Sequence, residues 1–193
     1  LSIQADIDAR LQSIKTMGFP NYFGQQRFGW NGNNLVQASE LFQQDNSART
    51  SKRKSKGRRR SSEQNKQGLY ISAVRSWMFN ELLSQRIEDG SWNEMIAGDI
   101  LQLDGSSKWF AADSEEDING LKQRVEDGDL HPSGVLFGDA DLVTTDLAKS
   151  HELSVERRHP AWMEGLKKLR VQPDRRAFRV CPANLEWRWL EQN

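Results

Sequence analysis

Residues 21–29, NYFGQQRFG, combine three aromatic side chains with an asparagine, two adjacent glutamines and an arginine. Phe23 and Phe28 suit a hydrophobic core, but the amides and the guanidinium around them would find few partners inside one. The segment therefore predicts a site or the wall of one.

The remaining sequence contains no pattern typical of a nucleotide cofactor or a common hydrolase, since P-loop, GxGxxG, GxSxG and HExxH motifs are all missing. His131, His151 and His159 are scattered, so we expect no metal site. The acids of DSEED at 113–117 suit a helix start better than a catalytic pair. The single cysteine, Cys181, excludes an internal disulfide and favours an intracellular protein. We expect no cofactor.

A basic segment stands out in a chain of zero net charge. RTSKRKSKGRRR at 49–60 holds eight of the 27 Lys and Arg residues and no acid. Such a block repels itself and precedes the polar SSEQNKQ, so we expect a flexible loop over 49–66. A solvated linker and a phosphate-binding surface remain open, with a nuclear-localisation run as a third reading. On the second reading the RNA contacts come from Lys52, Arg53, Lys54, Lys56, Arg58, Arg59 and Arg60.

Helices and strands must position these residues, and hydrophobic spacing predicts an α+β protein. Ile3, Ile7, Leu11 and Ile14 recur at helical spacing up to Gly18, so the NYFG motif should follow a helix end directly. Asn33 or Asn34 is expected to cap the second helix. The second helix is expected over residues 35–44, and further helices are expected over 69–88, 114–125, 145–157 and 160–170.

Alternating patterns predict the strands. DILQL at 99–103 and KWFAA at 108–112 flank DGSS, which indicates a hairpin. RRAFRV at 175–180 and LEWRWL at 185–190 alternate as half-buried strands. HPSGVLFGDAD at 131–141 contains Pro and Gly and is expected to be an irregular connection.

With 193 residues, the chain can form one domain or one and a half. No apolar run approaches the roughly 18 to 20 residues that span a bilayer, and the polar start is unlike a signal peptide. The chain opens on Leu1 and stops directly after a strand-like pattern. These ends lead us to expect a fragment. Because no apolar run is long enough, we expect no membrane partner.

GFPNYFGQQRFG at 18–29, followed by NGNNL, resembles the signature of the TruD family of tRNA pseudouridine synthases. That family carries a proline, Asn-Tyr-Phe-Gly and Gln-Arg-Phe-Gly at this spacing. The resemblance continues through LYISAVRSWMFNELLSQRI, GDILQLDGSSKWF and RRAFRVCPANLEWRW. It implies the edge of a mixed-sheet synthase domain over residues 1–45. The family's inserted α/β domain would occupy 46–193 and return toward the catalytic domain near the C-terminus.

The resemblance also implies a function: isomerisation of uridine, at position 13 of tRNA in bacterial members, by a cytoplasmic enzyme without cofactor or metal. In the family an aspartate acts as nucleophile, and the detached uracil turns and rejoins through carbon 5. By motif position, Phe23 is the stacking aromatic and Asn21 the polar active-site residue. Arg27 either holds phosphate or braces the loop, while Tyr22 and Phe28 pack. The complete enzyme is expected to be a monomer that binds tRNA.

The sequence also departs from the family pattern. The family's nucleophile lies in a Gly-x-Lys-Asp segment before the NYFG motif, and no aspartate here follows a lysine in that way. We therefore expect the nucleophile upstream of Leu1, a Leu-Pro-x-Gly-Ser-like stretch beyond Asn193, and an inactive fragment. Two alternatives remain. One is a catalytically inert RNA-binding or interaction module derived from the family, and the other is a structural domain whose basic loop has no RNA role.

Overall fold

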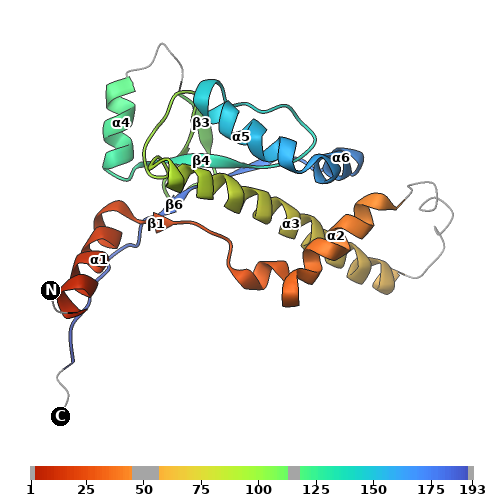
Figure 1. Cartoon of the computed structure of the whole chain (residues 1–193), viewed down its shortest axis with the longest axis horizontal. Helices are drawn as coiled ribbons and strands as arrows, with labels where there is room; N and C mark the ends of the chain where they lie inside the picture. The colour runs from red at the N-terminus through yellow and green to blue at the C-terminus, as the bar shows by residue number, and fades with distance from the viewer. Residues whose placement is uncertain (1–2, 45–56, 113–117, 191–193) are drawn as a thin grey trace.

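The structure is a computed structural model that describes residues 3–44, 57–112 and 118–190, with only the backbone for 57–62. Helices and short antiparallel strands alternate along the chain (Figure 1), which confirms the α+β class. The helices are α1 (Ile3–Met17), α2 (Asn33–Gln43), α3 (Gly57–Glu88), α4 (Ile118–Glu126), α5 (Asp146–Arg158) and α6 (Pro160–Lys168). Two short 3₁₀ turns, η1 (Gln25–Phe28) and η2 (Trp30–Gly32), precede α2.

The strands form two separate sheets. The larger sheet has the order β3-β2-β4-β5 and is antiparallel throughout, and the smaller one pairs β1 with β6 near the two ends of the described chain. The hairpin predicted around DGSS is confirmed as the pair β2 and β3. The bounds are β1 (Phe19–Pro20), β2 (Ile100–Leu103), β3 (Trp109–Ala111), β4 (Leu130–Leu136), β5 (Asp174–Ala177) and β6 (Arg179–Val180).

The main hydrophobic core forms where α3 packs against β4 and the neighbouring helices. Figure 1 shows α3 as the longest element, with α2 beside its N-terminal half. The apolar residues of α3 recur three and four positions apart, so they share one face of the helix. Burying that face removes a large apolar area from water, which is the main driving force for this packing. The core residues are Ala38, Phe42, Val74, Met78, Phe79, Leu82, Leu83, Val135, Phe137, Val155, Met163, Leu166 and Phe178.

Helix α1 lies apart from this core and buries none of its residues. In Figure 1 it lies at one side of the molecule, together with the last described segment of the chain. The indoles of Trp187 and Trp189 both donate to the carboxylate of Asp8 on α1, at 2.7 and 3.1 Å from Oδ1.

Within the described residues, no helix has both the length and the apolar character that crossing a membrane requires.

The expectation of an irregular connection over 131–141 is wrong for 131–136, because residues up to Leu136 form the buried strand β4, and it is confirmed for 137–141. Pro132 lies opposite Leu101 of β2 but precedes Ser133, where pairing with β5 begins. Pro132 has no backbone N–H, and the hydrogen bonds between β4 and β5 therefore do not require one at this position. At Gly134 an added Cβ would lie 2.4 Å from the ring of Phe178, so this glycine permits close packing instead of a turn.

Part of the segment expected to be a loop is helical, because α3 begins at Gly57 instead of near residue 69. Residues 57–66 are therefore helical, and the predicted loop over 49–66 is wrong for that part. Arginine and lysine are good helix formers, and this propensity competes with charge repulsion. Residues 45–56 lie outside the described part of the chain.

Two smaller expectations also fail. The segment 185–190 forms no strand, and α2 follows Gly32 in the left-handed conformation (φ 74°) instead of an asparagine cap. The Asn34 side chain instead donates from Nδ2 to the carbonyl of Arg27 at 3.0 Å. The other helices are confirmed, although the expected start of α4 at 114–117 lies outside the described residues.

Candidate functional site

The NYFG segment begins where α1 ends and the chain crosses to the C-terminal strand. Gly18 has φ 76°, and a Cβ there would lie 2.6 Å from the carbonyl oxygen of Val180. Only glycine permits this conformation and this backbone approach without strain. Phe19 then pairs with Val180 in the two-stranded sheet. The close approach of the two backbones at Gly18 brings the NYFG segment beside the strand β6, which follows β5.

The side-chain amide of Asn21 connects the motif to β5. The backbone N–H of Asn21 donates to the carbonyl of Phe178 at 2.8 Å, and its Nδ2 donates to the carbonyl of Ala177 at 2.9 Å. Its Oδ1 accepts a short hydrogen bond from Nη2 of Arg176. The amide of Asn21 therefore holds the Arg176 guanidinium, and it retains a second N–H for another acceptor.

Phe23 is fixed by α3. The amide of Asn80 makes two hydrogen bonds to the Phe23 backbone, accepting from its N–H at 2.9 Å and donating to its carbonyl at 3.0 Å. The half-buried Phe23 ring meets Phe79 edge-on, with 5.6 Å between the centroids and 80° between the planes. Asn80 and Phe79 therefore determine where the Phe23 ring lies.

Two guanidinium groups lie over the Phe23 ring. The distance from Cζ to the ring centroid is 4.2 Å for Arg176 and 5.2 Å for Arg27, close enough for cation–π attraction. Arg27 also donates from Nη1 to the hydroxyl of Ser72 on α3 at 3.2 Å. Burial lowers the pKa of Arg176 below its ordinary value, and the nearby charge of Arg27 lowers it further. The cluster is therefore positively charged and partly desolvated.

The other aromatic residues of the motif have different environments. Phe28 is buried and meets Trp77 edge-on at 5.5 Å, which confirms its expected packing role. Tyr22 is instead exposed, and its hydroxyl shares a hydrogen bond of 2.9 Å with Ser84. Trp30 is 88% exposed at the turn that follows the motif.

The structure brings together Asn21, Phe23 and Arg27 and adds Arg176, which sequence reasoning missed. RRAFRV contains three arginines, and only the tertiary contacts distinguish them. Neighbouring strand residues point to opposite faces, and Arg175 and Arg176 accordingly have different partners. Arg175 pairs with Glu152 at 2.9 Å, whereas Arg176 contacts the motif.

Three of the seven basic residues of the predicted RNA surface fall within the described part of the chain. The three at 58–60 lie at the beginning of α3, where only the backbone is described. At about 1.5 Å of rise per residue, that end of α3 lies roughly 30 Å along the helix axis from Asn80. The backbone of residues 58–60 is therefore distant from Asn80, which holds Phe23. The other four, Lys52, Arg53, Lys54 and Lys56, lie outside the described residues.

The histidines do not combine into a metal site. Among residues 3–44, 57–112 and 118–190, no group of three or more His, Cys, Asp or Glu side chains could hold a metal ion. Each histidine instead lies beside a carboxylate, as in the pairs His131 with Asp104, His151 with Asp89, and His159 with Glu81.

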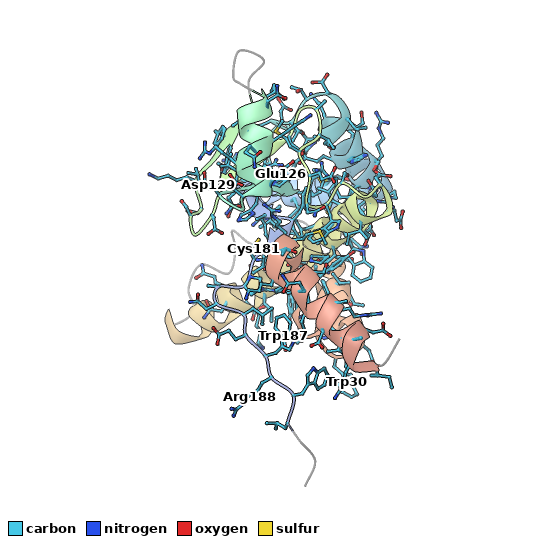
Figure 2. All side chains as sticks on the ribbon, turned by 90° about the vertical axis from the view of Figure 1, so that its left-hand side faces the viewer. Trp30, Glu126, Asp129, Cys181, Trp187 and Arg188 are labelled. Carbon is cyan, nitrogen blue, oxygen red and sulfur yellow. The ribbon has the colours of Figure 1, made fainter. Side chains whose placement is uncertain are left out.

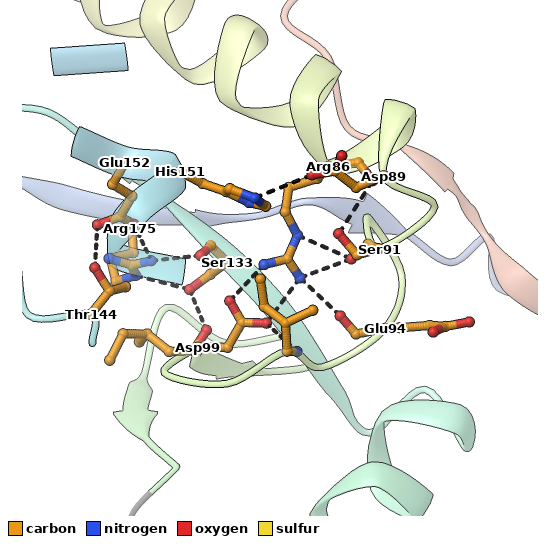
Figure 3. Close-up of polar contacts among 12 residues, drawn as sticks. Arg86, Asp89, Ser91, Glu94, Asp99, Ser133, Thr144, His151, Glu152 and Arg175 are labelled. Carbon is orange, nitrogen blue, oxygen red and sulfur yellow. Dashed lines mark hydrogen bonds and ion pairs between the residues drawn. The ribbon is translucent and has the colours of Figure 1, made fainter. Parts of the chain in front are cut away.

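A buried polar network supports the strand that carries Arg176 (Figure 3). Arg86 contacts both carboxylate oxygens of Asp99 at 2.8 and 2.9 Å, and both side chains are 1% exposed. Arg175 binds Glu152 and the hydroxyl of Ser133 on β4. The Arg175 bonds join β4 and α5 to β5, and the Arg86 bonds join α3 to the segment before β2. Arg176 is thus carried by a strand with fixed neighbours.

Comparison with known proteins identifies the family. Residues 50–188 match the family model "tRNA pseudouridine synthase D (TruD)". The chain is 46% identical over 186 residues to tRNA pseudouridine synthase D of Hydrogenovibrio crunogenus, covering 96% of this chain and 49% of that protein. The corresponding protein of Methylococcus capsulatus is 37% identical over 97% of this chain and 49% of its own length. The chain therefore spans about half the length of the curated relatives it matches.

A solved structure agrees with the fold. The crystal structure of a TruD protein from Methanosarcina mazei superimposes with a TM-score of 0.66 at 19% identity, covering 92% of this chain and 55% of that one. At this identity the likeness concerns the fold alone, whereas the family model covers most of the sequence. The chain belongs to the TruD family of tRNA pseudouridine synthases.

Proposed function

We propose that this chain is part of an enzyme that isomerises uridine to pseudouridine in tRNA, with position 13 as the expected target. The observation that carries the proposal is the cluster in which Arg27 and Arg176 lie over the Phe23 ring and Asn21 binds Arg176. An aromatic ring, an amide and positive charge are the groups expected to receive a nucleotide that has left its stack. The family membership supplies the reaction class.

In this proposal Phe23 stacks with the extruded uracil, and Asn21 uses its remaining N–H for the uracil edge or steadies the site. Arg176 covers a face of the Phe23 ring, with Cζ 4.2 Å from the centroid. A uracil that approaches that face must displace the guanidinium or stack on it, and both kinds of contact occur in RNA recognition. Arg27 is close enough to contribute charge at the same place.

The carboxylate nucleophile comes from another part of the complete enzyme in this proposal. Among the described residues, no carboxylate forms an ion pair with Arg27 or Arg176. The upstream location expected from the family pattern agrees with this observation. The complete enzyme would act on tRNA as a cytoplasmic monomer that needs no cofactor or metal.

We propose the domain division given by the resemblance, with the synthase edge over 1–45 and the inserted domain over 46–193. Pairing of β1 with β6 supports a return of the chain toward the synthase domain near its C-terminus. Helix α2 contributes Ala38 and Phe42 to the core formed by α3 and α6. Residues 33–43 would therefore fold together with the inserted domain, although the proposed boundary follows them.

The test uses the complete reading frame, obtained by extending the gene on both sides. The purified enzyme is incubated with unmodified tRNA transcripts, and pseudouridine is mapped by carbodiimide-dependent stops of reverse transcription. The proposal predicts a new stop at one uridine in a subset of tRNAs. An enzyme that binds tRNA without producing any stop would instead support the inert RNA-binding module.

A further inference from the structure

The positive charges of Arg27 and Arg176 both lie beside the Phe23 ring, and no acid of the described residues forms an ion pair with them. Their Cζ atoms lie 5.2 and 4.2 Å from the centroid of the Phe23 ring, and both side chains are only partly exposed. Their hydrogen-bond partners are neutral, namely the Ser72 hydroxyl and the Asn21 oxygens. No ion pair within the described part of the chain includes either arginine.

Two buried arginines of the same protein form ion pairs with buried carboxylates. Arg86 has Asp99 and Arg175 has Glu152, each at hydrogen-bond distance (Figure 3). Such pairing matters because a desolvated charge without a counter-charge costs free energy. Among the described residues, the pair beside Phe23 has no such ion-pair partner, and neither does the buried Arg179, which binds His131 and the carbonyls of Val125 and Leu130.

The charges on these arginines also act on each other. Burial lowers the pKa of Arg176, and the charge of Arg27 lowers it further, without an acid that raises it. Burial also lowers the pKa of Arg75, but there Asp174 offsets part of the effect. A bound anion between Arg27 and Arg176 would remove their mutual repulsion.

We propose that Arg27 and Arg176 together bind a phosphate of the RNA substrate beside Phe23, an inference that rests on the proposed function. Each guanidinium carries five N–H donors, and the contacts described above use only some of them. Planar guanidinium groups bind phosphate oxygens in pairs of parallel hydrogen bonds, which gives both affinity and orientation. The subsite would fix the backbone of the nucleotide whose base reaches Phe23.

A phosphate suits this position better than a distant charge on the tRNA would. A nucleotide that leaves its stack carries its own phosphates with it, so base and phosphate arrive together. Asn21 contacts Arg176, and Arg176 contacts Phe23, so amide, charge and ring are already linked. The competing occupant is a carboxylate from another part of the enzyme, and the experiment below distinguishes the two.

The experiment uses the complete enzyme and a tRNA assembled by ligation, after the modified uridine has been mapped. An uncharged methylphosphonate replaces the phosphate on the 5′ or the 3′ side of that uridine. tRNA affinity and single-turnover rate are measured for wild type, Arg27→Gln, Arg176→Gln and Arg176→Lys. The matched control is Arg157→Gln, which removes an exposed arginine on α5. Melting temperatures verify that each variant is folded.

In the wild type, one of the two methylphosphonates should lower affinity or rate by roughly tenfold, the scale of a hydrogen bond to a charged group. The penalty should be clearly smaller in Arg27→Gln and in Arg176→Gln, because each variant has already lost one of the two partners of the phosphate. Arg176→Lys should retain part of the penalty, and Arg157→Gln should retain all of it. The salt slope of binding should also flatten by roughly 0.7 to 0.9 in Arg176→Gln.

Equal penalties in wild type and Arg176→Gln, or no penalty at either position, would overturn the inference. An unchanged salt slope together with a lower melting temperature in Arg176→Gln would identify a protein carboxylate as the occupant, which also overturns it. If the wild-type enzyme produced no pseudouridine, the proposed function itself would fail. An active wild type without this coupling would reject only the phosphate subsite.

Discussion

The guanidinium of Arg176 lies over the ring of Phe23, with 4.2 Å between Cζ and the ring centroid. Phe23 follows α1, whereas Arg176 belongs to β5 near the other end of the described chain. The contact depends on the pairing of β1 with β6 and on the amide of Asn21, which bonds both Arg176 and the Ala177 carbonyl. The candidate site is therefore a product of the tertiary fold, and changes in the scaffold and in the site can be tested separately.

The basic segment should add nonspecific RNA affinity. Replacing Lys52, Lys54 and the arginines at 53 and 58–60 by glutamine should flatten the salt dependence of tRNA binding, since each lost phosphate contact removes roughly 0.7 to 0.9 from the logarithmic slope. Glutamine is a good helix former, so α3 should persist. The measurement is tRNA affinity of the complete enzyme across a salt series. Unchanged affinity and slope would favour the solvated-linker reading.

Phe28 and Trp30 provide a matched pair within the motif region. Phe28→Ala should destabilise the fold by about 3 kcal/mol, because a buried ring that packs against Trp77 is removed. Trp30→Ala should change stability by less than about 0.5 kcal/mol, since the indole is 88% exposed. Urea unfolding of the complete enzyme checks both values. Similar losses for the two variants would contradict the structure around the turn.

The buried pair of Arg86 and Asp99 should be a strong determinant of stability. Asp99→Ala leaves the Arg86 charge without its partner and should cost about 3 to 5 kcal/mol. The control is Asp129→Ala, because its pair with Arg124 is exposed at 45% and 54% and should contribute at most about 1 kcal/mol. Unfolding curves measure both variants. Equal losses would show that burial does not distinguish the pairs.

The 193-residue chain alone should produce no pseudouridine, because the expected Gly-x-Lys-Asp nucleophile segment is not part of it. The assay is carbodiimide-dependent mapping of unmodified tRNA after incubation with this chain. The complete enzyme serves as the positive control. A uridine-specific stop above background with the chain alone would reveal a nucleophile within its own residues.

Much of the fold could be predicted from the sequence where the periodicity was long, as in the helices that became α5 and α6. The prediction failed at β4 because Pro132 and Gly134 usually interrupt strands. Here Pro132 precedes the residues that pair with β5, and Gly134 permits close packing against Phe178. The alternation in 185–190 predicted a strand, but the segment forms none, and the indoles of Trp187 and Trp189 instead bind Asp8.

The candidate site could be predicted only as far as the motif extends. Asn21, Phe23 and Arg27 are close in sequence, so their types and spacing indicated a shared role. Arg176 and Asn80 join them through long-range packing, and no local pattern distinguishes Arg176 from Arg175. Their roles follow from which partners the fold supplies, and this information is not local.

The central claim is that the Phe23 site performs uridine isomerisation, and substitutions in the complete enzyme can test it. Phe23→Ala should remove about 1 to 3 kcal/mol of base stacking, which corresponds to a roughly 5- to 150-fold slower single-turnover rate. Asn21→Ala should act similarly on the rate. Phe23→Leu keeps apolar volume against Phe79 and separates loss of stacking from loss of packing.

The most direct measurement is the single-turnover rate of pseudouridine formation by Phe23→Ala, with tRNA affinity and melting temperature measured on the same preparation. We predict that the rate falls far more than the affinity, because phosphate contacts elsewhere still hold the tRNA. Phe23→Leu should melt close to the wild type and still react slowly. Normal turnover by a stably folded Phe23→Ala enzyme would contradict the account and remove Phe23 from the active site.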